Sequence, residues 1–140
     1  MHYYFQFCFF TVIQNNVKMY WCASLIFRLS WVTRLGTKYK VGAVVHTGFL
    51  HFLPVFAIIK KIVVVDGELN SFFFILESLH TIEYHEHYHA YKVEKPFDKN
   101  ITICTQEELT LFLPMHYTNP VNTNGSYVNI KYDVDLLNLV

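Results

Sequence analysis

An Asp66-Gly67 pair between two runs of β-favouring residues is the feature that most constrains the fold. Residues 58–65 and 72–76 are rich in valine, isoleucine and phenylalanine, which favour strands. An Asp-Gly pair tolerates the positive φ angles of the tight turns that join hairpin strands. The sequence therefore predicts a β-hairpin over residues 58–76.

Several shorter segments outside this hairpin also have strand character. Residues 86–93 alternate, with His87, His89, Tyr91 and Val93 expected on one face of an extended strand. Other strands are predicted at residues 39–47, 55–59, 101–104 and 127–134. Thr105 and Glu108 fit a capping box, which predicts a short helix over residues 106–113, stopped by Pro114.

These elements predict an all-β chain. Five or six short strands separated by turn residues are typical of a small barrel, here SH3-like in size, with one short helix. We expect three parts: an apolar N-terminal extension over residues 1–37, a barrel module over 38–135, and a tail over 136–140. Since the extension has no cation before Lys18, it does not match a secretory signal peptide.

Composition excludes intrinsic disorder. Hydrophobic residues make up 53% and charged residues 16% of the 140-residue chain, against about 25% charged in typical soluble domains. The formal net charge of zero indicates no global attraction to nucleic acid or anionic lipid. The charges are unevenly placed, because every acidic residue lies at or after Asp66. That asymmetry indicates either two parts of different origin or a basic segment that meets an anionic surface.

Four histidines lie within ten residues, at positions 80, 85, 87 and 89. On an extended strand His85, His87 and His89 would share a face, and their imidazoles could hold zinc with His116, His80 or Glu83 completing the shell. The alternative is that some of these histidines are satisfied inside the barrel and the others face solvent. We therefore expect no cofactor, with zinc held by His85, His87, His89 and His116 as the alternative.

Other sites of chemistry are not indicated. Cys8, Cys22 and Cys104 are odd in number and widely spaced, as expected of buried thiols rather than of a disulfide framework or zinc finger. The sequence has no G-x-S-x-G, P-loop or G-x-G-x-x-G motif. The numerous aromatic residues are expected mainly in the core, with a peptide-binding groove as the alternative.

Residues 41–59 form an uncharged stretch flanked by lysines on both sides. Its length would suffice for a transmembrane helix. Gly42, Gly48 and Pro54 disfavour a continuous helix, and His46 and His51 add polarity. We therefore expect two buried strands there, and keep a membrane span over residues 41–59 as an alternative.

Residues 38–134 resemble a small β module found in the C-terminal regions of uncharacterised, transposon-derived animal proteins. Val41-Gly42-Ala43-Val44-Val45 resembles the opening strand of that module. The run Pro54-Val55-Phe56-Ala57-Ile58-Ile59-Lys60-Lys61-Ile62 and the run His87-Tyr88-His89-Ala90-Tyr91-Lys92-Val93 resemble two further strands. Ala43 and Ala57 depart from its pattern, which favours an acidic residue and a glycine there.

The resemblance implies a non-catalytic interaction module rather than an enzyme. Its partner would be a protein or a nucleic acid, and its location would be the nucleus. The first 36 residues match nothing in the module, and no zinc-finger or nuclease region is visible, so the resemblance also implies a fragment. The alternatives from other classes are the small membrane protein and the histidine-cluster metal protein described above.

Overall fold

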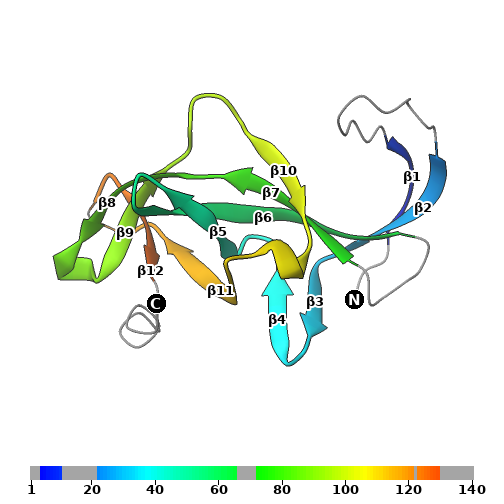
Figure 1. Cartoon of the computed structure of the whole chain (residues 1–140), viewed down its shortest axis with the longest axis horizontal. Helices are drawn as coiled ribbons and strands as arrows, with labels where there is room; N and C mark the ends of the chain where they lie inside the picture. Colours follow the sequence, from blue (N-terminus) through cyan, green and yellow to red (C-terminus); the bar gives the residue numbers. More distant parts are fainter. Residues whose placement is uncertain (1–3, 11–21, 66–71, 122, 130–140) are drawn as a thin grey trace.

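The computed structural model of the chain describes residues 4–10, 22–65, 72–121 and 123–129 (Figure 1). The predicted all-β fold is confirmed, since the only helical turns among these residues are two short 3-10 turns, η1 (Glu86–Tyr88) and η2 (Gln106–Glu108). The first six strands are β1 (Tyr4–Phe10), β2 (Cys22–Leu29), β3 (Trp31–Arg34), β4 (Thr37–Lys40), β5 (Val44–Leu50) and β6 (Leu53–Val65). The other six are β7 (Phe72–Ser78), β8 (His80–His85), β9 (Ala90–Glu94), β10 (Ile101–Cys104), β11 (Leu111–Thr118) and β12 (Ser126–Asn129).

The long strand β6 organises the main sheet. Its first half pairs with β5 and its last residues pair with β2, while β7 pairs along its other edge. From β5 the sheet continues through β11, β12, β9 and β8, and β10 pairs with β7 on the outside. All of these pairs are antiparallel, and β3 and β4 form a separate two-stranded hairpin.

The sheet is strongly curled, as a half-barrel, because β7 runs directly into β8 along the start of β6 (Figure 1). The backbone N–H of Leu79 donates to the carbonyl of Phe56 at 2.8 Å. The Thr81 hydroxyl donates to the carbonyl of Pro54 at 2.6 Å. These bonds bring the last strand of the sheet order back against β6, so the curled part encloses an interior.

A β-bulge divides β6. The pairing of β6 with β7 shifts between Ile59 and Lys61, and both Lys60 and Lys61 are exposed. Because a bulge adds one residue to one strand, the alternation of faces restarts after it. Ile59 and Ile62 are therefore both fully buried on the same side, although they are three residues apart.

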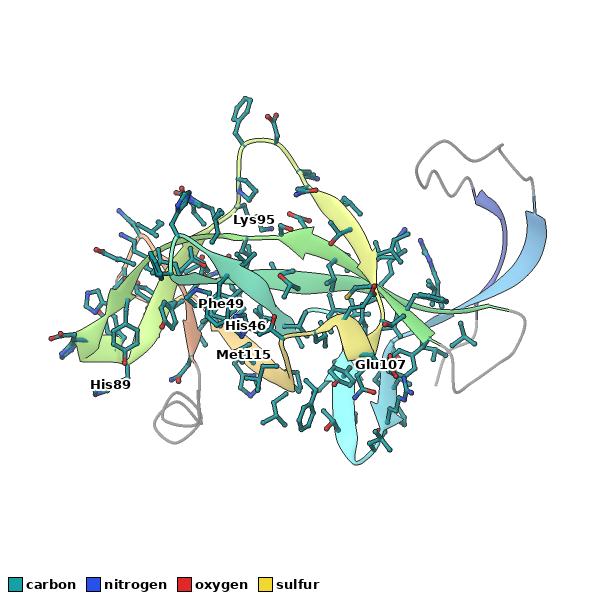
Figure 2. All side chains as sticks on the ribbon, viewed as in Figure 1. His46, Phe49, His89, Lys95, Glu107 and Met115 are labelled. Carbon is teal, nitrogen blue, oxygen red and sulfur yellow. The ribbon has the colours of Figure 1, made fainter. Side chains whose placement is uncertain are left out.

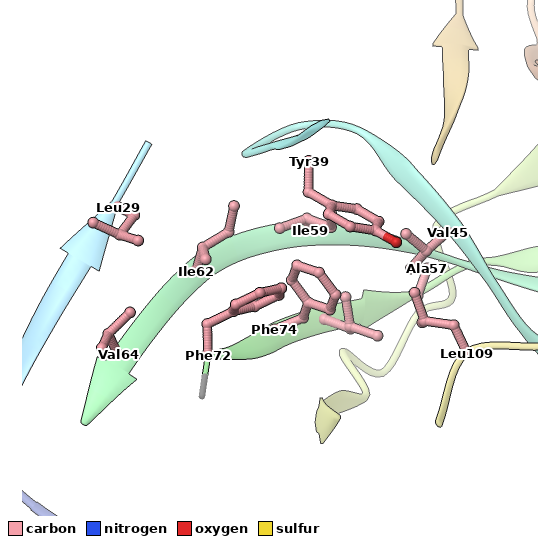
Figure 3. Close-up of a cluster of buried hydrophobic side chains, with 11 residues drawn as sticks. Leu29, Tyr39, Val45, Ala57, Ile59, Ile62, Val64, Phe72, Phe74 and Leu109 are labelled. Atoms are coloured by element: carbon pink, nitrogen blue, oxygen red, sulfur yellow. The ribbon is translucent and has the colours of Figure 1, made fainter. Parts of the chain in front are cut away.

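The first core, on one face of β6 and β7, is covered by the β3–β4 hairpin and by the segment that follows η2 (Figure 3). Tyr39 is fully buried there, with its ring centroid 4.9 Å from that of Phe74. Its hydroxyl donates to the carbonyl of Phe112 and accepts from the Gln106 amide at 2.8 Å. The members are Leu29, Tyr39, Val45, Ala57, Ile59, Ile62, Val64, Phe72, Phe74, Leu76 and Leu109.

The second core fills the curled part of the sheet. Phe56 and Ile58 point into it, whereas their neighbours Ala57 and Ile59 point into the first core, as alternation along a strand requires. Its members are Val44, Phe56, Ile58, Leu79, Val93, Met115 and Val128. β6 thus contributes to both cores of the molecule.

Several predicted elements are confirmed. The two runs of the predicted hairpin pair as β6 and β7, while the Asp66-Gly67 turn lies outside the described residues. Strand 101–104 is β10, and strand 55–59 belongs to β6. The strand predicted over residues 127–134 is described only as far as Asn129.

Three element predictions are wrong. The strand predicted over residues 39–47 is interrupted by a turn at Val41 and Gly42, so its two ends belong to β4 and β5. The capping box of Thr105 and Glu108 is present, but the helix predicted over residues 106–113 is a single 3-10 turn. Residues from Leu111 onward pair with β5 instead, and Pro114 falls where that pairing is irregular, a position that tolerates a residue without an N–H. The strand predicted over residues 86–93 begins only at Ala90, because β8 and β9 pair up to His85 and Ala90 and residues 86–89 make the connection.

The membrane helix considered for residues 41–59 is not formed. That segment holds β5, a two-residue turn and the first half of β6. Among the described residues, we find no helix with the length and apolarity needed to span a bilayer. The boundary expected near residue 38 falls inside β4, in the β3–β4 hairpin. Of the residues before it, β2 belongs to the main sheet through its pairing with β6, and Leu29 belongs to the first core.

Candidate functional site

The histidine-rich segment is a hairpin end rather than a single strand. His85 is the last residue of β8, His87 lies in η1, and His89 has a left-handed backbone with φ of 46°. The expected alignment of His85, His87 and His89 on one strand face is therefore wrong, because the chain turns between them. In Figure 2, His89 lies at the outer end of this hairpin, far from His46 in the body of the molecule.

His85 belongs to a cluster of rings. It stacks on Tyr88 with 4.7 Å between centroids and meets Tyr127 edge-on at 5.9 Å. His87 lies 6.5 Å from His85, centroid to centroid, and 5.1 Å from Tyr88. The buried Nδ1 of His85 has no hydrogen-bond partner among the described residues. This arrangement stabilises the hairpin by aromatic packing.

The other metal-ligand candidates lie apart from this cluster. His80 forms a hydrogen bond with Glu94, with 3.0 Å between Nδ1 and Oε1. His116 is an exposed residue of β11 and lines a hollow of about 540 Å³ beside β4. In the part of the chain that the structure describes, no three histidine, cysteine, aspartate or glutamate residues are grouped to hold a metal ion. Zinc binding by His85, His87, His89 and His116 thus gains no support.

The β5–β6 turn is the one place among the described residues where two successive non-glycine residues have positive φ angles. Leu50 pairs with Leu53, so the turn consists of His51 and Phe52, with φ angles of 50° and 67°. Such two-residue turns favour asparagine and glycine, because a side chain in the left-handed region costs about 1 kcal/mol or more. Strain of this kind is retained where surrounding structure or function requires it.

His46 contacts the end of β5 that leads into this turn. Its Nε2–H donates to the carbonyl of Gly48 at 2.8 Å, and its ring meets that of Phe49 edge-on, with 4.8 Å between the centroids. Figure 2 labels both residues. Burial lowers the pKa of His46 below its ordinary value, although the bond to Gly48 acts in the opposite direction. The imidazole is therefore neutral at physiological pH, and the strand that carries the strained turn is held by a neutral buried ring.

A hollow of about 460 Å³ lies beside the turn. The turn and the 95–100 loop both line it, and the β7–β8 junction supplies Leu79 and Thr81. Each of the two loops carries a phenylalanine exposed to the full extent: Phe52 at 102% and Phe97 at 103% of the reference area. Phe49 and Leu50 add partly exposed apolar surface, at 61% and 58%. We name Phe49, Leu50, Phe52 and Phe97, together with this hollow, the tip surface.

The tip surface was not predicted from the sequence. Phe97 stands in Lys95-Pro-Phe-Asp-Lys-Asn100, where a single aromatic residue among loop residues was the available signal. Phe52 lies between the strands predicted over residues 39–47 and 55–59, and the sequence made no prediction about the exposure of its ring. Only the turn at His51 and Phe52 places this ring in solvent.

No family of known proteins, no curated protein and no solved structure matches this chain. The function is therefore argued from its own surfaces. The tip surface offers apolar side chains and few ionisable groups, with His51, His80 and Asp98 at its hollow. Such a surface is suited to binding, because large exposed apolar residues gain most from being covered by a partner.

Proposed function

We propose that the chain is a non-catalytic interaction module that binds a protein partner through the tip surface. The observation that carries this proposal is the pair of fully exposed phenylalanines, Phe52 and Phe97, on the two loops that line one hollow. Buried in a complex, an aromatic side chain is among the residues that contribute most to affinity. In the free chain the apolar surface of each ring stays in contact with water, so covering it by a partner is favourable.

The strained turn supports the same proposal. Asparagine and glycine would relieve the turn but would remove the exposed ring of Phe52. The hollow beside it is large enough for one or two side chains of a partner. The resemblance to a module of transposon-derived proteins, with its SH3-like size, fits a binding role in the nucleus and stays part of the proposal.

The proposal is tested by selecting peptides that bind the full chain from a random peptide library. The affinity of each selected peptide is then measured by fluorescence anisotropy. We expect Phe52→Ser and Phe97→Ser each to weaken binding about tenfold or more, as loss of a central aromatic contact does.

The chain offers a matched control in Leu35. Leu35 is 90% exposed and has a φ of 49° in the two-residue turn between β3 and β4, so its setting closely repeats that of Phe52. Leu35→Ser should leave peptide affinity unchanged. If the selected peptides bind Phe52→Ser as tightly as the wild type, or if no peptide is selected, the proposed function is wrong.

A further inference from the structure

The sheet made by β2, β6, β7 and β10 has a second face, opposite the first core. The register places Arg28 beside Val63, Lys61 beside Ile75, and Ile75 beside Ile103. Directly paired residues share a face, and their neighbours along each strand point the other way. Because Ile62, Val64, Phe74 and Leu76 point into the first core, the residues between them form the opposite face.

This face is open to solvent along β10. Ile101 and Ile103 are 51% and 55% exposed, although both are large aliphatic residues in a regular strand. Ile101 pairs with Glu77 and Ile103 with Ile75, so the two isoleucines extend the same face outward. We name Arg28, Lys60, Lys61, Ile75, Ile101 and Ile103 the basic face.

Three cations gather on the basic face at the β6 bulge. Arg28, Lys60 and Lys61 line a hollow of about 360 Å³ whose other lining residues are uncharged: Leu29, Ser30, Val41 and Ile62. Glu77 forms an ion pair with Lys60 at 3.1 Å. Among the described residues, Arg28 and Lys61 have no ion-pair partner.

Two further lysines border the basic face. Lys95 and Lys99, in the loop before β10, both lower the pKa of the Glu77 carboxyl, after the larger effect of its hydrogen bond to Lys60. Their charges therefore act at the same place as that of Lys60. Figure 2 shows Lys95 where the loop above β7 begins. The surroundings of Glu77 are thus positive, although the whole chain has a net charge of zero.

We propose that the basic face binds the surface of an anionic lipid bilayer. Exposed aliphatic side chains beside lysine and arginine match the two layers of such a surface, since isoleucine can enter the acyl boundary while cations meet the phosphates. A nucleic-acid strand would also attract the cations, but its bases stack on aromatic rings, and the exposed apolar residues here are isoleucines. The proposal goes beyond the tip surface and does not depend on it.

The test is flotation of the full chain with vesicles of phosphatidylcholine alone and with vesicles that also contain phosphatidylserine. We expect binding to the second kind only, and weaker binding at high salt because salt screens the attraction. Lys61→Gln and Lys99→Gln should each lower the partition coefficient about fivefold, as expected for one basic residue near a charged membrane. Ile103→Thr, which keeps a β-branched residue in the strand, should also lower it.

Control variants come from residues outside the basic face. Lys38→Gln removes an exposed lysine of β4 that lines the hollow beside His116, and Phe112→Thr changes a residue on β11 that is 52% exposed. Neither should alter flotation. The proposal is overturned if the wild type does not float with phosphatidylserine vesicles, if Lys38→Gln weakens binding as much as Lys61→Gln, or if a single-stranded oligonucleotide is bound in preference to the vesicles. Peptide binding through Phe52 should be unchanged in Lys61→Gln, so failure here is distinct from failure of the proposed function.

Discussion

The two faces of the β6–β7 sheet are built from alternate residues of the same strands, yet they have opposite fates. On one face Phe74 and Leu76 are buried beneath the β3–β4 hairpin, and on the other Ile75 lies beside Lys61 and the exposed Ile103. The covered face gains stability from burial, because each apolar side chain removed from water contributes about 1.5–3 kcal/mol. On the open face Ile75 is half-buried and Ile101 and Ile103 are more than half exposed, so they gain less, although Val63 of the same face is buried. The difference teaches that residue type alone does not decide burial here, because similar aliphatic residues are buried where other elements cover the sheet and exposed along β10.

The largest expected difference between the two faces is in the stability lost when a residue of each is replaced by alanine. Phe74→Ala leaves a cavity in the first core and should lower the free energy of unfolding by about 3–5 kcal/mol. Ile75→Ala, one residue away on the half-buried face, should lower it by roughly 1 kcal/mol or less. Urea unfolding of both variants measures the difference. Equal losses would show that the open face is covered in solution.

The ion pair between Lys60 and Glu77 tests the open face separately, because the Glu77 carboxylate is buried although it lies on that face. Glu77 is 4% exposed, so Lys60→Met should lower the free energy of unfolding at neutral pH by about 1–3 kcal/mol, the cost of a buried carboxylate without its partner. The pKa of Glu77 is lowered in the folded chain, chiefly by its hydrogen bond to Lys60. The contribution is therefore complete above the ordinary pKa and is lost as the pH falls through the lowered value.

The difference between wild type and Lys60→Met should consequently shrink in acid. Chemical unfolding at a series of pH values measures it, and Lys60→Arg, which keeps the charge, should stay close to the wild type. A difference that is the same at neutral and acidic pH would contradict this account of the pair.

On the covered face, the Tyr39 hydroxyl joins three elements. Tyr39→Phe removes its bonds to Phe112 and Gln106 and should lower the free energy of unfolding by about 1–2 kcal/mol, since the amide and carbonyl lose a buried partner. Combining it with Gln106→Leu should cost less than the sum of the two single changes, because the unpaired amide is then gone. A strictly additive result in urea unfolding would rule out this coupling.

The rate of thiol modification distinguishes the two faces with the smallest expected change in stability. Cys104 packs against the first core, and burial raises the pKa of its thiol to about 11 from 9.0, so its thiolate fraction is about a hundredfold lower. In a background of Cys8→Ser and Cys22→Ser, iodoacetamide should modify Cys104 slowly. Adding Cys104→Ser and Ile103→Cys moves the thiol to the open face, where modification should be fast. Equal rates would contradict the assignment of faces.

The sequence predicted the fold class and the β6–β7 pairing because both depend on local residue preferences. It mispredicted residues 86–93, since the alternation of His87 and His89 cannot reveal that β8 and β9 turn back between them. It also extended the helix after Thr105, because pairing of Leu111 with His46 is a long-range contact that no local pattern records. The tip surface and the basic face were missed for the same reason: exposure of Phe52, Ile101 and Ile103 depends on which elements lie above them.

The β6 bulge determines what the deletion of a single residue would do to this strand. Because Lys60 is the extra residue, the in-frame loss of its single codon would restore unbroken alternation along the strand. Lys61 and Val63 would keep their face, and Ile62 and Val64 would still point into the first core, because Ile59 and Lys61 already pair with neighbouring residues of β7. The strand can therefore lose one residue at the bulge without changing its faces, whereas loss of Val63, outside the bulge, would turn Val64 away from the first core.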